Sequence, residues 1–195
     1  MKIGIQGGEG SFNHSAALKY ISENGIKNAK IEYLYTSERV LAALEAGEVD
    51  LGLFAIFNTL GGVVEESAEA IGKHDFQYVD TLSLQIRHFL MCSHECSAAD
   101  LKTIYAHPQV FIQCALTLGK RYASVELRSG DGEMIDTARA AQALASGELD
   151  KHCAILGNKD MAEIYGLKIV DEDLQDREDN NTHFLIVRPL KQLKA

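Results

Sequence analysis

The chain has 195 residues, of which 46% are hydrophobic and 24% charged, and its 28 acidic and 19 basic residues give a formal net charge of -9. This composition is typical of a globular protein, built as one large domain or as two small lobes. The negative charge and the lack of a Lys/Arg-rich run disfavour nucleic acid and anionic membranes as partners, but a local pocket for a small anion remains compatible. No apolar run approaches a membrane span and the N-terminus lacks a signal-peptide pattern, so we predict a cytoplasmic protein.

The first half of the chain predicts alternating strands and helices. KIGIQGGEGSFNHSAALKYI, residues 2–21, indicates a strand, a glycine-rich loop and a helix. An Ala-rich helical pattern then ends in LEAGEVD, residues 44–50, and the apolar segment LGLFAI follows. Gly47 has the position of a helix C-cap glycine.

Four cysteines are scattered along the chain, which indicates reduced thiols rather than a disulfide framework. The stretch HFLMCSHEC, residues 88–96, contains His88, Cys92, His94 and Cys96, whose side chains can bind metals. No second Cys/His pair at zinc-site spacing follows. We therefore predict a strand that ends in a polar turn, and no metal site.

The second half repeats the order of the first. LKTIYAHPQVFIQCALTLGKRY, residues 101–122, again indicates a strand, a polar loop and a helix, and LASGELD at 144–150 matches LEAGEVD. Two tandem sets of parallel βαβ units predict an α/β fold of two lobes with a central cleft. Ligands of such sheets bind beyond the carboxyl ends of the strands, which selects the loops at 6–13, 56–62, 106–109 and 157–160.

Each selected loop offers polar groups. The loop GGEGSFNHS resembles a phosphate cradle, but it matches neither the P-loop nor the dinucleotide pattern, and Ser11 or Asn13 can equally cap the helix. The loop AIFNTLGGVVEES presents Asn58 and Thr59 before two glycines, whose backbone N–H groups can approach a ligand. The third loop carries His107, and Gln113 follows one turn into the helix, as either a surface residue or a buried hydrogen-bonding group.

The stretch DREDNNTHFLIV, residues 176–187, is a polar turn that leads into an apolar strand. Thr182 and His183 stand where the turn becomes the strand. In isolation, such a pair more often only satisfies backbone groups. Its possible catalytic role depends on the rest of the chain.

Four segments, taken in order, resemble the signature segments of the prephenate dehydratase family: GGEGSFNHSAA, AIFNTLGGVVEES, YAHPQVFIQC and NNTHFLIV. The resemblance covers residues 1 to about 188. It implies two α/β lobes like a type II periplasmic binding protein, with residues 1–79 and 169–195 in the first lobe and 80–168 in the second. It also implies a homodimer and a cofactor-free lyase that converts prephenate to phenylpyruvate in phenylalanine biosynthesis.

The resemblance assigns residues to the site. The family's catalytic threonine, loop asparagine and helix glutamine fall on Thr182, Asn58 and Gln113. The remaining substrate-binding positions that we predict, from the resemblance and the loops, are Ser11, Phe12, Thr59, Gly61, Gly62, His107, His183 and Phe184. Loss of carbon dioxide and formation of an aromatic ring drive the reaction, so the protein needs only to help the ring hydroxyl leave by hydrogen bonding or protonation.

Three positions depart from the family pattern: Phe57 replaces a Glu, Ala106 a Ser, and His183 an Arg. We expect no regulatory domain of the ACT type within this chain. The alternatives are arogenate dehydratase, a decarboxylase or isomerase acting on a related cyclohexadienyl acid, and a non-catalytic sensor of small carboxylates. The retained Thr182 favours dehydration.

Overall fold

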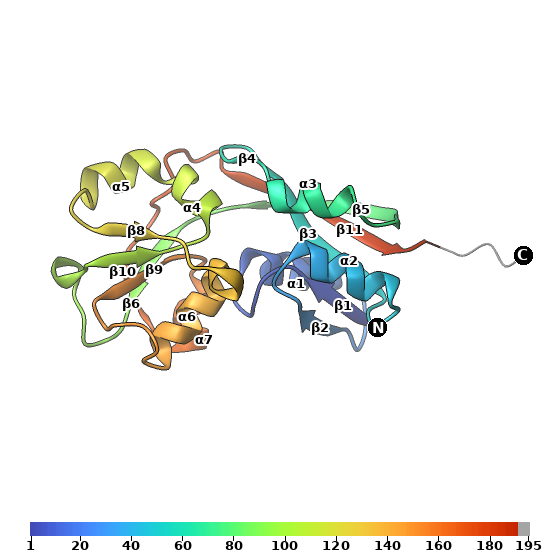
Figure 1. Ribbon diagram of the computed structural model, residues 1–195, viewed down its shortest axis with the longest axis horizontal. Coiled ribbons are helices and arrows are strands. Elements are labelled where there is room, and N and C mark those ends of the chain that lie inside the picture. Colours follow the sequence, from blue (N-terminus) through green and yellow to red (C-terminus); the bar gives the residue numbers. More distant parts are fainter. Residues whose placement is uncertain (191–195) are drawn as a thin grey trace, which may run out of the picture. The chain divides into compact units, whose positions relative to one another are not determined.

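The computed structural model describes residues 1–190 and divides into two compact units (Figure 1). Unit 1 contains Met1–Gly7, Asn13–Leu84 and the C-terminal segment from Asn181, and unit 2 contains Gly8–Phe12 and Gln85–Asn180. Each unit has its own sheet. Residues 191–195, which we assigned to the first lobe, lie outside the described residues.

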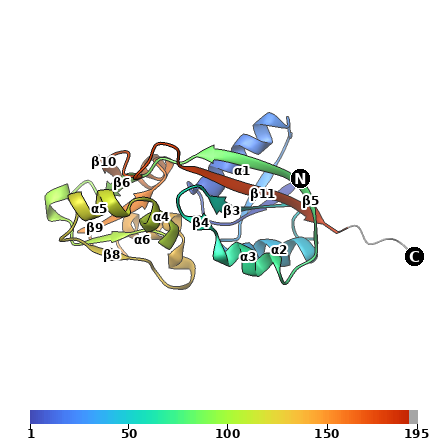
Figure 2. The ribbon, with the colours of Figure 1, turned by 90° about the horizontal axis from the view of Figure 1, so that it is seen from above.

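Unit 1 is built on a mixed sheet of order β2-β1-β3-β11-β5, with β4 paired to β3. The long strands β5 and β11 run side by side (Figure 2). Its elements are β1 (Lys2–Ile5), α1 (Phe12–Glu23), β2 (Lys30–Tyr33), α2 (Ser37–Glu45), β3 (Leu51–Asn58), β4 (Gly62–Val63), α3 (Glu65–Ile71), β5 (Phe76–Gln85) and β11 (Asn181–Pro189).

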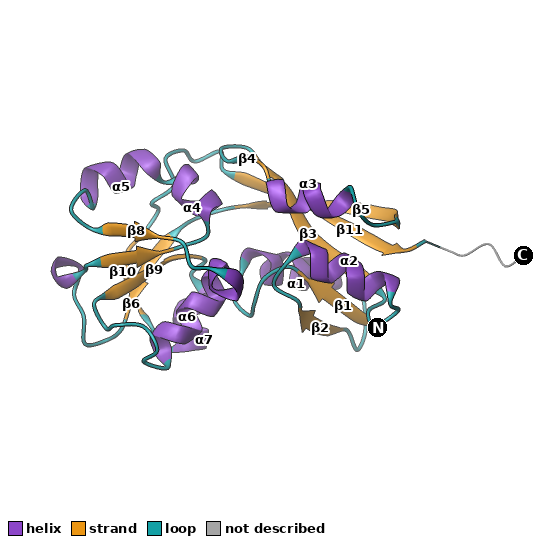
Figure 3. Ribbon diagram, viewed as in Figure 1, coloured by secondary structure: helices purple, strands orange, loops and turns teal. Residues whose placement is uncertain are grey.

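Unit 2 has a sheet of order β10-β6-β9-β7-β8 and two short 3-10 turns (Figure 3). Its elements are β6 (Phe89–Cys92), β7 (Thr103–Tyr105), α4 (Pro108–Gln113), α5 (Ala115–Arg121), β8 (Glu126–Arg128), α6 (Thr137–Ala145), β9 (Cys153–Gly157), α7 (Asp160–Tyr165) and β10 (Lys168–Asp171). The turns are Ala98–Asp100 and Gly132–Ile135.

The predicted repeat is present in both sheets. Strands β2-β1-β3 and β8-β7-β9 have the same spatial order, and all of their pairings are parallel. The predicted parallel βαβ units are therefore confirmed, and each is extended by an antiparallel pairing, of β11 with β3 and of β6 with β9. An antiparallel strand therefore flanks each three-stranded parallel core.

The two repeated glycines end their helices in the same way. Gly47 and Gly147 have positive φ angles of 71° and 78°. The N–H of Gly47 donates to Leu44 O and the next N–H to Ala43 O, and the same pattern occurs at Gly147. This is a Schellman motif, in which a left-handed residue satisfies the last carbonyls of the helix. The C-cap prediction is confirmed at both sites.

The boundaries between the units differ from the predicted 79/80 and 168/169. Unit 2 runs from Gln85 to Asn180, because β10 pairs antiparallel with β6 and so belongs to the second sheet. The chain returns to unit 1 only with β11, which pairs with β3. We assigned the return too early because an apolar strand pattern does not specify which sheet the strand joins.

Each unit has buried apolar clusters of its own. In unit 1, side chains of α2 and α3 pack on β3 and β11 around Phe54. In unit 2, one cluster includes Leu118 and Leu156, and another places the alanines of α6 against β9. Close packing of these faces holds the loops at the strand ends in fixed positions.

The stretch HFLMCSHEC forms β6, which is buried along its whole length, and a turn, as predicted. All four cysteines are buried free thiols. Among the side chains that the structure describes, no three of His, Cys, Asp or Glu are grouped as a metal site would need. Nor do the described helices include one with the length and hydropathy to cross a membrane.

Candidate active site

In unit 1, two predicted catalytic residues meet where β3 ends and β11 begins. Thr182 lies opposite Asn58 in the antiparallel register, and both side chains are buried. Asn58 Nδ2 donates to Thr182 Oγ1 at 2.9 Å. The pair is thus formed by residues 124 positions apart in the sequence.

The side chain of Asn58 makes a full set of hydrogen bonds inside unit 1. Its amide nitrogen donates to Thr182 Oγ1 and, at 3.2 Å, to Asn181 O. Its Oδ1 accepts from the backbone N–H groups of Leu60 and Gly61 at 2.9 and 2.8 Å. An Asn side chain has two donor hydrogens and two acceptor lone pairs. Asn58 therefore fixes both the following turn and the hydroxyl of Thr182.

The bond from Asn58 orients the Thr182 hydroxyl. Because Oγ1 accepts this bond, its own proton points elsewhere. Among the described residues, the Thr182 side chain makes no other hydrogen bond. The hydroxyl is therefore available as a donor to a bound molecule.

Thr59 and the two glycines support the same turn. Thr59 exchanges two bonds of 2.9 Å with the backbone of Asn181, through its Oγ1 and its N–H. The Gly61 N–H is taken by Asn58, and Gly62 has a φ of 75°, which favours glycine. We expected the N–H groups of this loop to meet an anionic ligand. At Gly61 that expectation is wrong, because the Gly61 N–H already donates to Asn58 Oδ1 within the turn.

His183 points to the opposite face of β11 from Thr182, because side chains alternate along a strand. Its cross-strand partner is Phe57, and the two ring centroids are 6.0 Å apart. Phe184 returns to the buried face and is completely buried. Two of the three departures from the family pattern are thus neighbours on the face that does not carry Thr182.

In unit 2, Gln113 is a buried hydrogen-bonding group and not a surface residue, since it is only 5% exposed. Its Oε1 accepts from Asn180 Nδ2 at 2.8 Å and lies 2.7 Å from Nε2 of His88. Burial lowers the pKa of His88 to about 4, so its imidazole is neutral at pH 7. The ring of Phe12 packs against His88 in a T-shaped contact, with centroids 5.4 Å apart.

His107 begins α4 as its N-cap. Its ring Nδ1 accepts from the backbone N–H of Gln109 at 3.2 Å. The backbone N–H of His107 donates to Thr137 Oγ1 at 3.1 Å. Burial lowers the pKa of His107 to about 4. At neutral pH this residue therefore carries no positive charge for a substrate carboxylate.

The glycine-rich loop at residues 8–12 belongs to unit 2. The Gly8 N–H donates to Asp136 Oδ2 at 2.9 Å, Gly10 O accepts from Asn158 Nδ2 at 3.0 Å, and Tyr165 donates to Glu9 O at 2.9 Å. An internal carboxylate thus takes the Gly8 N–H, which we expected to serve an anionic ligand. Ser11, which with Phe12 is one of the two predicted binding residues of this loop, is buried.

Asp136 is the N-cap of α6, and its side chain accepts backbone bonds from both Arg139 and Gly8. Burial raises the pKa of this carboxyl to about 6, and the backbone N–H donors only partly oppose the shift. Because the folded-state pKa lies above that of the unfolded chain, ionisation destabilises the fold. The destabilisation develops between about pH 4 and 6 and is complete above that range.

We expect Asp136→Asn to become more stable relative to wild type as the pH rises, since the amide keeps an acceptor oxygen and cannot ionise. From pH 4 to pH 7.5, the Tm difference should change in favour of the variant by about 5 to 10 °C. Thermal unfolding across this range measures it, with the exposed Asp131→Asn as control. A pH-independent difference would contradict the buried, ionising carboxyl.

The predicted residues form two groups. Asn58, Thr59 and Thr182 come together in unit 1, whereas Gln113 and Phe12 share a network in unit 2. Three residues of functional interest were not predicted as site residues: Asn180, Asp136 and His88, of which only His88 stood out in the sequence, as a side chain able to bind a metal. Asn180 stood in the polar turn before Thr182, and the Asp-Thr pair before an Ala-rich helix is an N-cap signal.

The two α/β units, each with a parallel core and a flanking antiparallel strand, define a protein of the type II periplasmic-binding-protein-like fold class. The family model of prephenate dehydratase matches residues 3–192. The chain belongs to the prephenate dehydratase family.

Two curated relatives illustrate the similarity. The chain is 32% identical over 187 residues to arogenate dehydratase/prephenate dehydratase 2 of Arabidopsis thaliana. This alignment covers 96% of the chain and 46% of the relative. It is 27% identical, also over 187 residues, to the bifunctional chorismate mutase/prephenate dehydratase of Pseudomonas aeruginosa. This alignment covers 96% of the chain and 48% of the relative. The chain thus spans about half the length of these relatives.

A solved structure shows the same fold. The crystal structure of prephenate dehydratase from Arthrobacter aurescens, in complex with L-Phe, superposes with a TM-score of 0.82 at 22% identity. The superposition covers all of this chain and 62% of the other.

Proposed function

We propose that this chain is a lyase that converts prephenate to phenylpyruvate, water and carbon dioxide in L-phenylalanine biosynthesis. The observation that carries the proposal is the Thr182 hydroxyl, which accepts from Asn58 at 2.9 Å and keeps its proton for a bound molecule. Membership of the prephenate dehydratase family supports the same reaction.

The reaction needs a hydrogen-bond donor at the oxygen of the ring hydroxyl that leaves. The bond between the ring and its carboxylate breaks, the electron pair enters the ring, and the ring hydroxyl leaves as hydroxide. The two negative charges of the substrate end on phenylpyruvate and on this hydroxide, which takes a proton from the solvent to become water. A hydrogen bond to the departing oxygen becomes stronger as negative charge develops there, and therefore lowers the barrier.

We assign the roles as follows. Thr182 donates to the departing oxygen, and Asn58 is a positioning residue, because its own donors and acceptors are used within the protein. Gln113 binds a polar group of the substrate. Thr59 holds the beginning of β11, and the neutral His107 caps the N-terminus of α4 and does not act as a cation.

Incubation of the purified protein with prephenate tests the proposal through product analysis. Phenylpyruvate, formed with equimolar carbon dioxide, is the expected result. Loss of carbon dioxide without dehydration would indicate a decarboxylase, and binding without turnover a carboxylate sensor; either overturns the proposal. Arogenate is assayed in parallel because curated relatives include arogenate dehydratases, and strict preference for it would change the substrate but keep the reaction class.

We infer that Phe57 and His183 replace the family's Glu and Arg as one compensated change. The two rings face each other across β3 and β11 at 6.0 Å, on the face opposite Thr182. An aromatic pair at this position can take over the cross-strand packing of an oppositely charged pair. On this basis the replacements are structural.

His183→Arg should therefore change phenylpyruvate formation by less than about threefold, as expected for a change outside the reacting centre. The double variant Phe57→Glu/His183→Arg should be at least as stable as the single one, since it restores opposite charges across the strands. Steady-state rates and thermal unfolding check both statements. A gain of tenfold or more from His183→Arg would show instead that the substrate lacks a cation in the wild type.

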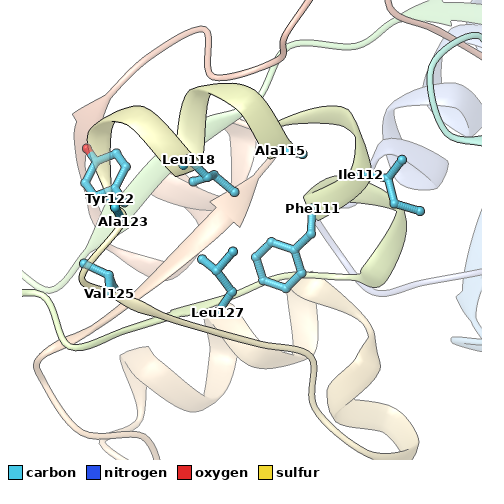
Figure 4. Close-up of a pocket in the computed structure, with 9 residues that line it drawn as sticks. Phe111, Ile112, Ala115, Leu118, Tyr122, Ala123, Val125 and Leu127 are labelled. Carbon is cyan, nitrogen blue, oxygen red and sulfur yellow. The ribbon is translucent and has the colours of Figure 1, made fainter.

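We propose that the chain forms a homodimer through an apolar groove and the adjoining edge of the sheet in unit 2. The groove has a volume of about 450 Å³ (Figure 4). Of its lining residues, Ile112 and Leu127 are 55% and 46% exposed, which is high for large apolar side chains. The groove is lined by Phe111, Ile112, Ala115, Leu118, Gly119, Tyr122, Ala123, Val125 and Leu127.

The edge strand favours a second copy as the partner. Glu126 and Arg128 hydrogen-bond to the β7 side through their backbones, so the backbone groups of Leu127 point away from it. Antiparallel self-pairing about Leu127 would set Glu126 opposite Arg128 of the second copy and join the two grooves. The edge is thus complementary to itself in charge and in apolar surface.

Leu127→Glu should convert the dimer to a monomer, because it places two like charges at the two-fold axis. Analytical ultracentrifugation measures the mass, with Val63→Glu as control, since Val63 is also an exposed apolar residue but lies in unit 1. A wild-type monomer, or a Leu127→Glu dimer, would contradict this interface.

We also propose a cytoplasmic location. The support is chemical: Cys92, Cys96, Cys114 and Cys153 are all free thiols, as expected in a reducing compartment. Cell fractionation tests it, and recovery of the protein outside the cytoplasm would contradict it.

A further inference from the structure

The carbonyl oxygen of Gln113 is enclosed by two side-chain nitrogens. Asn180 Nδ2 donates to it at 2.8 Å, and Nε2 of His88 lies 2.7 Å away. His88 and Asn180 are completely buried, and water cannot replace either contact. An amide oxygen has two lone pairs, so these two contacts use its full acceptor capacity.

The proton of His88 lies on Nε2. Burial keeps the imidazole neutral, with its pKa lowered to about 4, so the ring has a single N–H. Nδ1 is buried without a hydrogen-bond partner in the described part of the chain. A buried N–H without an acceptor is less tolerated than an unused lone pair, and the proton therefore occupies the nitrogen that faces Gln113.

The opposite orientation of the Gln113 amide is excluded by the same contacts. It would turn the NH2 group of Gln113 toward the N–H of His88 and the NH2 of Asn180, leaving buried donors facing each other. The T-shaped contact with Phe12 and a bond of 2.9 Å from the backbone N–H of His88 to Gln175 Oε1 hold the histidine in place. The amide is thus fixed in one orientation.

The Gln113 amide nitrogen is the free end of this network. In the part of the chain that the structure describes, no acceptor hydrogen-bonds to it. A nearly buried NH2 group of fixed direction, with no acceptor of its own, suits a ligand that brings an oxygen. It does not suit an ammonium group, which offers only donors.

We propose that His88 and Asn180 are positioning residues that lock Gln113 as a hydrogen-bond donor to a substrate oxygen, and that this lock disfavours a substrate with an ammonium group at that position. The proposal rests on the proposed dehydratase function, and adds to it that Gln113 donates a hydrogen bond to the substrate and does not accept one. His88 acts through Gln113 and does not contact the substrate.

Two substitutions at His88 test the lock. His88→Phe keeps a ring but removes the donor, so the amide can rotate, and KM for prephenate should rise about tenfold with kcat within about twofold. His88→Gln supplies a new side-chain donor and should recover most of the affinity. The exposed His94→Phe is the matched control. A wild-type KM in His88→Phe would overturn the proposal, as would an equal loss in both His88 variants.

The tautomer gives a second readout that does not depend on turnover. In the ligand-free protein, 15N NMR should show His88 protonated on Nε2 and bare on Nδ1, without titration between pH 5 and 8. A proton on Nδ1 would overturn the lock whatever the activity. If wild type forms no phenylpyruvate, the proposed function fails by itself, and the Kd of phenylpyruvate for wild type and His88→Phe then replaces KM in deciding the positioning role.

Discussion

Thr182→Val is expected to reduce phenylpyruvate formation by at least about 100-fold, the lower end of the range for a proton donor placed at a reacting group. Valine keeps nearly the shape of threonine and removes only the hydroxyl. Affinity for prephenate should stay within about threefold, because the lost hydrogen bond is strongest in the transition state and not in the bound substrate. Single-turnover rates and equilibrium binding separate the two quantities.

A matched substitution controls for the chemistry of Thr→Val itself. Thr81 is an exposed threonine on β5, and Thr81→Val should leave both turnover and affinity unchanged. Undiminished phenylpyruvate formation by Thr182→Val would remove Thr182 from the catalytic assignment. A large loss of affinity with unchanged turnover would make it a binding residue only.

Asn58→Asp is expected to lower turnover by a similar factor, about 100-fold or more, through a reversed hydrogen bond. The amide of Asn58 now donates to Thr182 Oγ1 at 2.9 Å. A carboxylate can only accept, so the Thr182 hydroxyl would donate to it and no longer to the departing oxygen. The acceptor side would be retained, because Leu60 and Gly61 still have an oxygen to bond.

The fold is expected to survive this substitution, which circular dichroism and thermal unfolding check. Asn24→Asp makes the same change at the end of α1, where the amide bonds only the local backbone, and should have wild-type activity. In the double variant Asn58→Asp/Thr182→Val, the loss should hardly exceed that of Thr182→Val alone, because both changes remove the same donor. Additive losses would give Asn58 a separate contact with the substrate.

The order of elements in this protein follows from local patterns. The periods of apolar residues predicted the repeated order of strands and helices in both halves, although the one helix predicted within residues 101–122 is divided into α4 and α5. Gly47 and Gly147 marked the helix ends through the left-handed conformation that glycine favours. The four motif segments led to the family and to Thr182, Asn58 and Gln113 as site residues. Each of these signals involves residues close in sequence.

The tertiary structure decided which polar groups can still hydrogen-bond to a ligand. Asn58 and Thr182 are 124 residues apart in the sequence, and Gln113 and Asn180 are 67 apart. No local pattern could therefore reveal that Asn58 directs the hydroxyl of Thr182, or that Asn180 holds the amide of Gln113. The N–H groups of Gly8 and Gly61, which looked ready for an anion in the sequence, are used by Asp136 and Asn58. The pairing of β10 with β6 likewise moved the unit boundary. Residue type sets how many hydrogen bonds a group can make, but only folding determines which of them the protein has already made.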